Sequence, residues 1–134
     1  MSEESTTPDL VKLLARLREA VNRRDFDKVM SVYAPDAVFQ GTELGTFEGA
    51  GAIRGFYEDA VTSYEEIHVK AEEVIDLGNG VTLAVLIAKG RPVGSSGEVR
   101  RRWAAVAIWT NGVVKRLVVY RDRDRALTDL GLKE

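Results

Sequence analysis

Two residues of opposite charge near the end of the chain have the types needed for acid–base chemistry. Asn111-Gly112 separates two runs rich in β-formers, and Asn-Gly is the typical two-residue loop of a tight hairpin. Strict alternation around this loop pairs Arg101 with Asp122. An aspartate in an apolar cavity acts as a base near neutral pH, whereas a neighbouring arginine keeps it ionised. Two roles are therefore open for Asp122: catalytic base, or partner in a structural ion pair.

Aromatic side chains are the candidate ligand-binding residues. The same register places Trp103 opposite Tyr120, beside the charged pair and on the face that also carries Trp109. The alternative role of each ring is ordinary core packing. The predicted pocket residues are Tyr33, Phe39, Phe56, Tyr57, Trp103, Trp109 and Tyr120.

Other charged residues have weaker signals. Asp124 is a second candidate base or the cap of a final helix. His68, the one histidine, alternates with Lys70 on a half-polar strand, so we expect it to face solvent. Alternation divides the run 100–102, Arg-Arg-Arg, between two faces, which favours a surface ion network over nucleic-acid binding.

Composition excludes several functional classes. The 134 residues suit one domain, with an expected disordered tail over 1–6 and a single domain over 7–134. The chain has no cysteine and one histidine, so neither a disulfide, a metal site nor a cofactor is predicted. The net charge of −2 does not favour nucleic acid or anionic membranes. No secretion signal and no membrane-spanning run is recognised, so we expect a cytoplasmic protein.

The elements that must position these residues follow from hydrophobic spacing. A first helix is expected to begin at Thr7-Pro8, and Asp25 is expected to cap a second. A third helix is expected over about 52–61, and a short last one over about 124–130. Expected strands cover about 37–40, 46–47, 64–76, 81–89, 98–110 and 113–123. This order predicts an α+β fold in which a curved antiparallel sheet wraps around the N-terminal helices.

The chain resembles the SnoaL-like branch of the nuclear transport factor 2-like superfamily. The matching segments are residues 22–27, 33–39, 47–49, 52–57, 111–114, 120–127 and 131–132. The resemblance implies a cone with an internal pocket and, commonly, a homodimer through the outer face of the sheet. The predicted hairpin supports the dimer independently, because it leaves an uncovered apolar patch of Ala104, Val106, Ile108, Leu117 and Val119.

The resemblance implies binding of a small apolar molecule, polyketide-like or aromatic. The alternative is a cofactor-independent cyclase, isomerase or hydrolase. Asp122 matches the acid/base aspartate of SnoaL-like cyclases, and Arg101 would stabilise an enolate oxygen. Residues that related enzymes require for catalysis are replaced here. Leu17, Gly41 and Ala104 or Ala105 occupy the positions of the catalytic residues of ketosteroid isomerases. Val85 and Ile87 occupy the positions of the catalytic residues of epoxide hydrolases of this fold. Neither of those two reactions is expected here.

Overall fold

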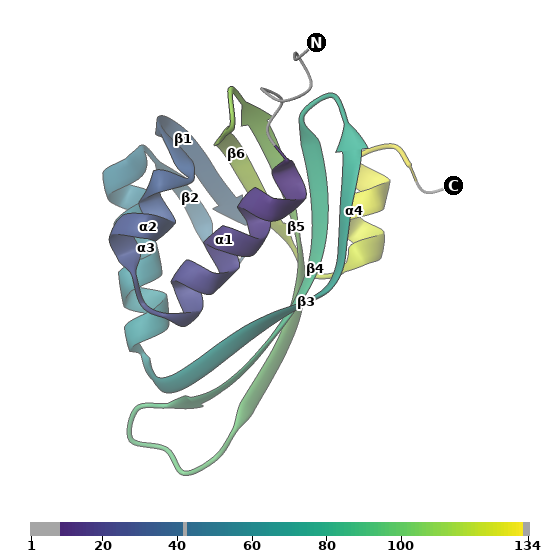
Figure 1. Cartoon of the computed structure of the whole chain (residues 1–134). Coiled ribbons are helices and arrows are strands. Elements are labelled where there is room, and N and C mark those ends of the chain that lie inside the picture. The colour runs from purple at the N-terminus through teal and green to yellow at the C-terminus, as the bar shows by residue number, and fades with distance from the viewer. Residues whose placement is uncertain (1–8, 42, 133–134) are drawn as a thin grey trace.

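The described residues form a curved six-stranded sheet and four helices, confirming the predicted α+β fold (Figure 1). The computed structural model describes residues 9–41 and 43–132. The helices are α1 (Leu10–Asn22), α2 (Phe26–Ser31), α3 (Ala50–Thr62) and α4 (Arg123–Asp129). The strands are β1 (Tyr33–Gly41), β2 (Gly45–Glu48), β3 (Tyr64–Gly78), β4 (Val81–Pro92), β5 (Val99–Thr110) and β6 (Val113–Tyr120). Their order is β2-β1-β6-β5-β4-β3, and only β1 and β6 pair in parallel.

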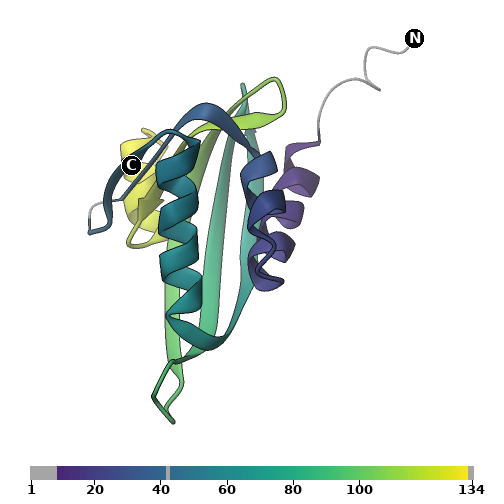
Figure 2. The ribbon, with the colours of Figure 1, turned by 90° about the vertical axis from the view of Figure 1, so that its left-hand side faces the viewer.

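Helices lie on both faces of the sheet. The inner face is covered by α1, α2 and α3, whereas α4 packs on the outer face (Figures 1 and 2). The larger core, on the inner face, centres on Leu17, Val29, Ile53 and Trp109. A smaller core joins Leu83, Ala104 and Val106 of the sheet to Ala126 of α4. In the described part of the chain, no helix has the length and apolar character needed to cross a membrane.

Aspartates begin the first two helices. Asp9 is the N-cap of α1 and accepts a hydrogen bond from the Lys12 amide (3.2 Å), so this helix begins at Leu10. The sequence placed its start earlier; Thr7 and Pro8, like the expected tail over 1–6, lie outside the described residues. Asp25 caps α2 as predicted and accepts from the Lys28 amide (3.1 Å).

The hairpin between β5 and β6 turns where expected but then shifts its register. Asn111 (φ 52°) and Gly112 (φ 80°) both have the positive φ of a type I′ turn, and Thr110 pairs with Val113. Trp109 pairs with Val114, but Ile108 pairs with Arg116, so Lys115 is an extra residue in β6. Since side chains alternate along a strand, this bulge moves the rest of β6 to the opposite face.

The neighbouring strand explains the bulge. Between its pairs with Val114 and Arg116 of β6, β1 is itself irregular over residues 34–37, where Pro35 has no amide to donate. Lys115 Nζ reaches both carboxylate oxygens of Asp36 at 2.7 Å. The extra residue in β6 therefore matches an irregularity in β1, a long-range constraint that alternation within the hairpin does not reveal.

The shifted register corrects which residues share a face. Tyr120 pairs with Ala104 instead of Trp103, so the predicted opposition of Trp103 and Tyr120 is wrong. The predicted apolar patch is also wrong. Leu117 and Val119 belong to the inner core, and α4 buries Ala104 and Val106. Of the predicted patch residues, only Ile108 remains exposed, at 39%.

The C-terminal end of α1 and the turn after it bind the free edge of the sheet, which is β3. The side-chain amide of Asn22 donates to the Val69 carbonyl (3.0 Å) and accepts from the Val69 amide (2.8 Å). Arg24 donates to the carbonyls of Tyr64 (2.7 Å) and Glu65 (3.1 Å). These side chains satisfy backbone groups that an open edge would offer to another strand.

Replacing Asn22 by aspartate is expected to destabilise this edge. The carboxylate keeps the bond from the Val69 amide but faces the Val69 carbonyl without a donor. We expect the free energy of unfolding in urea to fall by about 1–3 kcal/mol at neutral pH. Asn111→Asp is the matched control, because aspartate also suits this turn position. Equal stability of the two variants would show that the Asn22 contacts are dispensable.

Candidate functional site

An open groove lies between β2 and α3 on the helix-covered side of the sheet. Its volume is about 540 Å³. The α3 residues that line it recur at helical spacing, which places them along one stripe of the helix. The lining residues are Phe47, Ala52, Gly55, Phe56, Asp59 and Ala60. The groove wall is therefore mainly apolar, with one charged side chain, Asp59.

A continuous cluster of aromatic rings begins at the groove wall and extends into the core behind it. The ring centroids of Phe56 lie 4.9 Å from Phe47 and 4.7 Å from Phe39. Tyr57 extends the cluster from Phe56 (5.7 Å) to Tyr33 (6.0 Å). These separations and tilted orientations are typical of stabilising aromatic pairs. The two phenylalanines at the groove are thus held in place by a buried aromatic layer.

Two tyrosine hydroxyls meet behind these rings. The Tyr33 and Tyr57 oxygens are 2.6 Å apart, and Tyr33 is only 4% exposed. Burial raises the pKa of Tyr57 to about 12, although its hydrogen bond with Tyr33 opposes the increase. Burial, and then the proximity of Tyr57, raise the pKa of Tyr33 well above its usual value. Both phenols are neutral at physiological pH, so they are suited to hydrogen bonding and not to accepting a proton.

Four of the seven predicted pocket residues, Tyr33, Phe39, Phe56 and Tyr57, lie together in one aromatic cluster. Of these four, only Phe56 lines the groove. The prediction missed Phe47, which directly faces Phe39 across the β1–β2 pair. The expected pairing of the segments 37–40 and 46–47 contained the signal for this contact, because cross-strand partners share a face.

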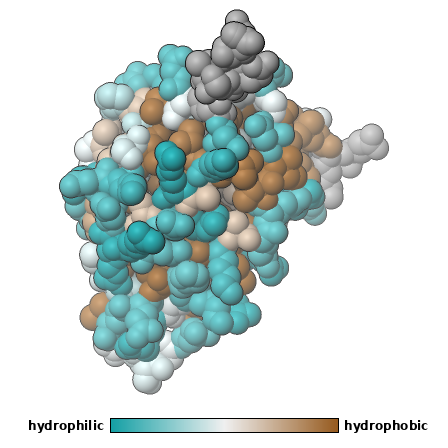
Figure 3. Space-filling model, viewed as in Figure 1, coloured by the Kyte–Doolittle hydropathy of each residue, from teal (hydrophilic) through white to brown (hydrophobic). Residues whose placement is uncertain are grey.

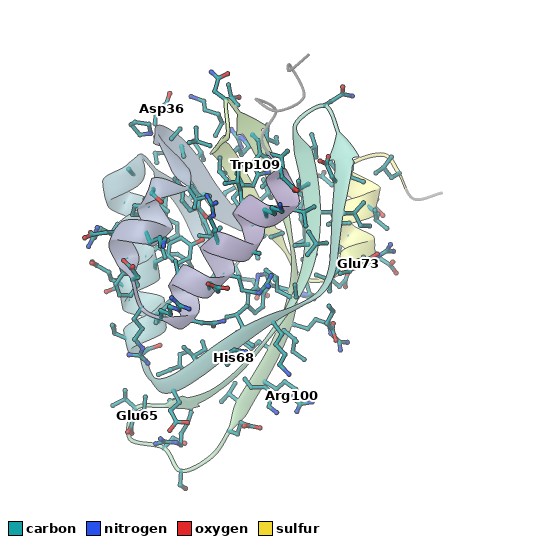
Figure 4. The ribbon with its side chains drawn as sticks, viewed as in Figure 1. Asp36, Glu65, His68, Glu73, Arg100 and Trp109 are labelled. Carbon is teal, nitrogen blue, oxygen red and sulfur yellow. The ribbon has the colours of Figure 1, made fainter. Side chains whose placement is uncertain are left out.

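The remaining three predicted pocket residues lie elsewhere. Trp109 is 6% exposed and its indole nitrogen donates to the Thr82 hydroxyl (2.9 Å), so it belongs to the core (Figure 4). Trp103 is half-buried and alternates with Ala105, which places it on the inner face. Tyr120 is on the outer face, where its hydroxyl donates to Asp129.

The predicted Arg101–Asp122 ion pair is wrong. Asp122 is the exposed N-cap of α4, and its carboxylate accepts from the Arg125 amide at 2.9 Å. Arg101 is exposed on β5, opposite Ala88 of β4. The register shift ends the β6 pairing before Asp122, and the chain then turns into α4. Asp122 thus has the capping role that the sequence suggested for Asp124.

The described residues contain no group of three or more histidine, aspartate or glutamate side chains that could hold a metal ion. His68 is exposed on β3 opposite Lys89, in agreement with its expected position. The titratable group in the groove wall is the carboxylate of Asp59, at its exposed side.

Solved structures share this fold at low sequence identity. An NTF2-like protein of unknown function from Burkholderia pseudomallei aligns with a TM-score of 0.76, at 18% identity over 91% of this chain and 97% of that chain. A Catenulispora acidiphila protein with a ketosteroid isomerase-like fold, in complex with trimethylamine, gives 0.75, at 16% identity over 96% of both chains. TerC, co-crystallised with polyporic acid, gives 0.72, at 15% identity over 90% of this chain and 95% of that chain.

Sequence comparison identifies the family more directly. No curated protein matches the chain in sequence. The family model of the SnoaL-like domain matches residues 14–117, from within α1 to within β6. This match includes every element that forms the groove, and the solved structures agree with it in fold. The chain belongs to the SnoaL-like family.

Proposed function

We propose that the protein binds a small, planar, largely apolar molecule in the groove between β2 and α3. One observation carries this proposal: an open groove of about 540 Å³ ends on the rings of Phe47 and Phe56. The aromatic layer behind them fixes their orientation, so little conformational entropy is lost when a ligand stacks on them. Asp59 would orient a polar substituent toward the exposed side of the groove.

Family membership supports a small-molecule ligand. TerC was crystallised with polyporic acid, and the Catenulispora protein is in complex with trimethylamine. These ligands belong to those proteins. At sequence identities of 15% and 16%, the similarity to this chain shows a shared fold only. The aromatic groove wall is the feature of this chain that favours a planar aromatic compound.

Catalysis by Asp122 is not part of the proposal. That carboxylate caps α4, the helix on the outer face, whereas the groove lies on the inner side. A general base must come within hydrogen-bond reach of the proton it removes. A homodimer through the outer face is not part of the proposal either, because four of the five patch residues that supported it lie under α4 or in the inner core.

Filling the groove is expected to prevent binding. Gly55 lines it, and a Cβ added there would meet no atom within 4 Å, so Gly55→Leu adds bulk without a backbone clash. We expect the affinity for neutral 1-naphthol, measured by calorimetry, to fall at least about tenfold, equivalent to about 1.4 kcal/mol. Helix stability should not suffer, because leucine is a better helix former than glycine.

Gly51→Leu is the matched control. Gly51 lies one turn earlier in α3, has equally free space around an added Cβ, and does not line the groove. This variant should bind 1-naphthol like the original protein. Equal affinities for both variants, or amide chemical-shift changes confined to residues away from Phe47 and Phe56, would overturn the proposal.

A further inference from the structure

Basic side chains line up across three strands on the outer face of the sheet, at the end away from α4. His68 of β3 pairs with Lys89 of β4, and Lys89 pairs with Arg100 of β5. Cross-strand partners project from the same face, so these three side chains form a row. Figure 4 shows His68 and Arg100 at this end of β3 and β5, and Figure 3 shows mainly hydrophilic residues covering it.

Three acidic residues nearby are already engaged, whereas Glu98 has no ion-pair partner among the described residues. Glu72 binds Arg102 (2.7 Å), the next residue of β5 on this face. Glu65 and Glu66 both bind Arg91 (3.3 and 3.1 Å). Among residues 9–41 and 43–132, Lys89 and Arg100 have no carboxylate within 4.0 Å. Two adjacent cations therefore lie opposite each other without a direct ion pair, and like charges in this position destabilise a sheet.

A hollow of about 660 Å³ adjoins this row. Its wall includes His68, Lys70 and Lys89 from the strands, and Ser96 and Glu98 from the loop between β4 and β5. Like Lys89, Lys70 has no ion-pair partner among the described residues. A concave surface with two free ammonium groups and one imidazole offers several hydrogen-bond donors to a single small anion.

We infer that the row of His68, Lys89 and Arg100, together with the hollow beside it, binds a small molecule carrying several phosphate groups. Neighbouring strands lie about 4.8 Å apart, so the row from His68 to Arg100 extends about 10 Å, a length that suits linked phosphates. Glu98 and the ion-paired Glu66 border the hollow, and their negative charges disfavour a long polyanion such as nucleic acid. The site is separate from the aromatic groove, which lies on the inner side.

Titration with inorganic tripolyphosphate tests this inference. We expect calorimetry at constant ionic strength to give one site, with affinity at least about tenfold weaker in Lys89→Ala. Arg102→Ala is the control: it removes the same charge from the same face, but that arginine already binds Glu72. Its affinity should stay within about twofold of the original. Lys89→Gln, which keeps a polar side chain but removes the charge, should lose affinity as Lys89→Ala does.

Stability without ligand supplies an independent measurement. Lys89→Ala should not lower the melting temperature, because it relieves repulsion with Arg100. Tripolyphosphate should raise the melting temperature of the original protein, because it binds the folded state. Potassium chloride at matched ionic strength should not reproduce this increase. Equal loss of affinity in Lys89→Ala and Arg102→Ala, or the same increase with chloride, would overturn the inference in favour of general charge screening. Tight binding of an oligonucleotide in competition with tripolyphosphate would also overturn it.

Discussion

Replacing Trp109 by alanine is expected to lower the free energy of unfolding by about 3–5 kcal/mol, the largest loss among the variants considered. The indole is 6% exposed and packs in the inner core with Leu117 and Val114. Its removal also leaves the Thr82 hydroxyl, in a residue 1% exposed, without its hydrogen-bond donor. Urea unfolding followed by circular dichroism measures the loss.

Trp103→Ala is the control for this prediction. Trp103 lies on the same strand and the same face but is half-buried, so its truncation removes less contact. We expect a clearly smaller decrease in the free energy of unfolding. A larger loss at Trp103 than at Trp109 would show that the core has been assigned to the wrong end of β5. Trp109→Phe should recover most of the lost stability, except for the contribution of the hydrogen bond to Thr82.

The second large effect is expected at the tyrosine pair. Tyr57→Phe leaves the hydroxyl of Tyr33 in a buried position without its 2.6 Å partner. This should reduce the free energy of unfolding by about 1–3 kcal/mol. Replacing both tyrosines by phenylalanine removes both polar groups, so the double variant should lose less than the sum of the single losses. The double-mutant cycle measures this difference, and strictly additive losses would contradict the pairing.

Alkaline pH provides a second readout for the same pair. The phenol of an unfolded tyrosine ionises near pH 10, whereas the pKa of Tyr57 in the folded protein is about 12. Because the folded-state pKa is raised, the stabilisation is complete below about pH 10 and is lost as pH rises toward about 12. Tyr57→Phe should flatten this decrease. Tyr120→Phe should flatten the same decrease, because the pKa of Tyr120 is also raised to about 12, first by burial and then by Asp129.

The sequence predicted the elements well because each depends on local patterns. The helical spacing from Leu10 to Val21, the capping role of Asp25 and the Asn-Gly turn all act over a few residues. The fold class followed from the order of these elements. Sequence alone thus located most of the aromatic cluster, since four of its five rings were among the predicted pocket residues.

The predicted Arg101–Asp122 pairing is wrong because it depended on register over a long distance. One inserted residue, Lys115, moved Tyr120 to the other face and separated Asp122 from Arg101. Apolar residues occupy both faces of β6 (Leu117 inside, Tyr120 outside), so its pattern is compatible with either register. The covering of the outer face by α4 was missed for a related reason: a seven-residue helix has too few turns to show a clear apolar stripe.

The parallel pairing of β1 with β6 has a consequence for biosynthesis. Asp36 and Lys115 are 79 positions apart, yet they meet where these two strands pair. During synthesis, β1 and β2 therefore cannot pair with the other four strands until β6, the last strand in the sequence, has been made. Until β6 is made, Phe39 of β1 lacks its neighbour Leu117, and exposed apolar surface of this kind favours aggregation of incomplete chains.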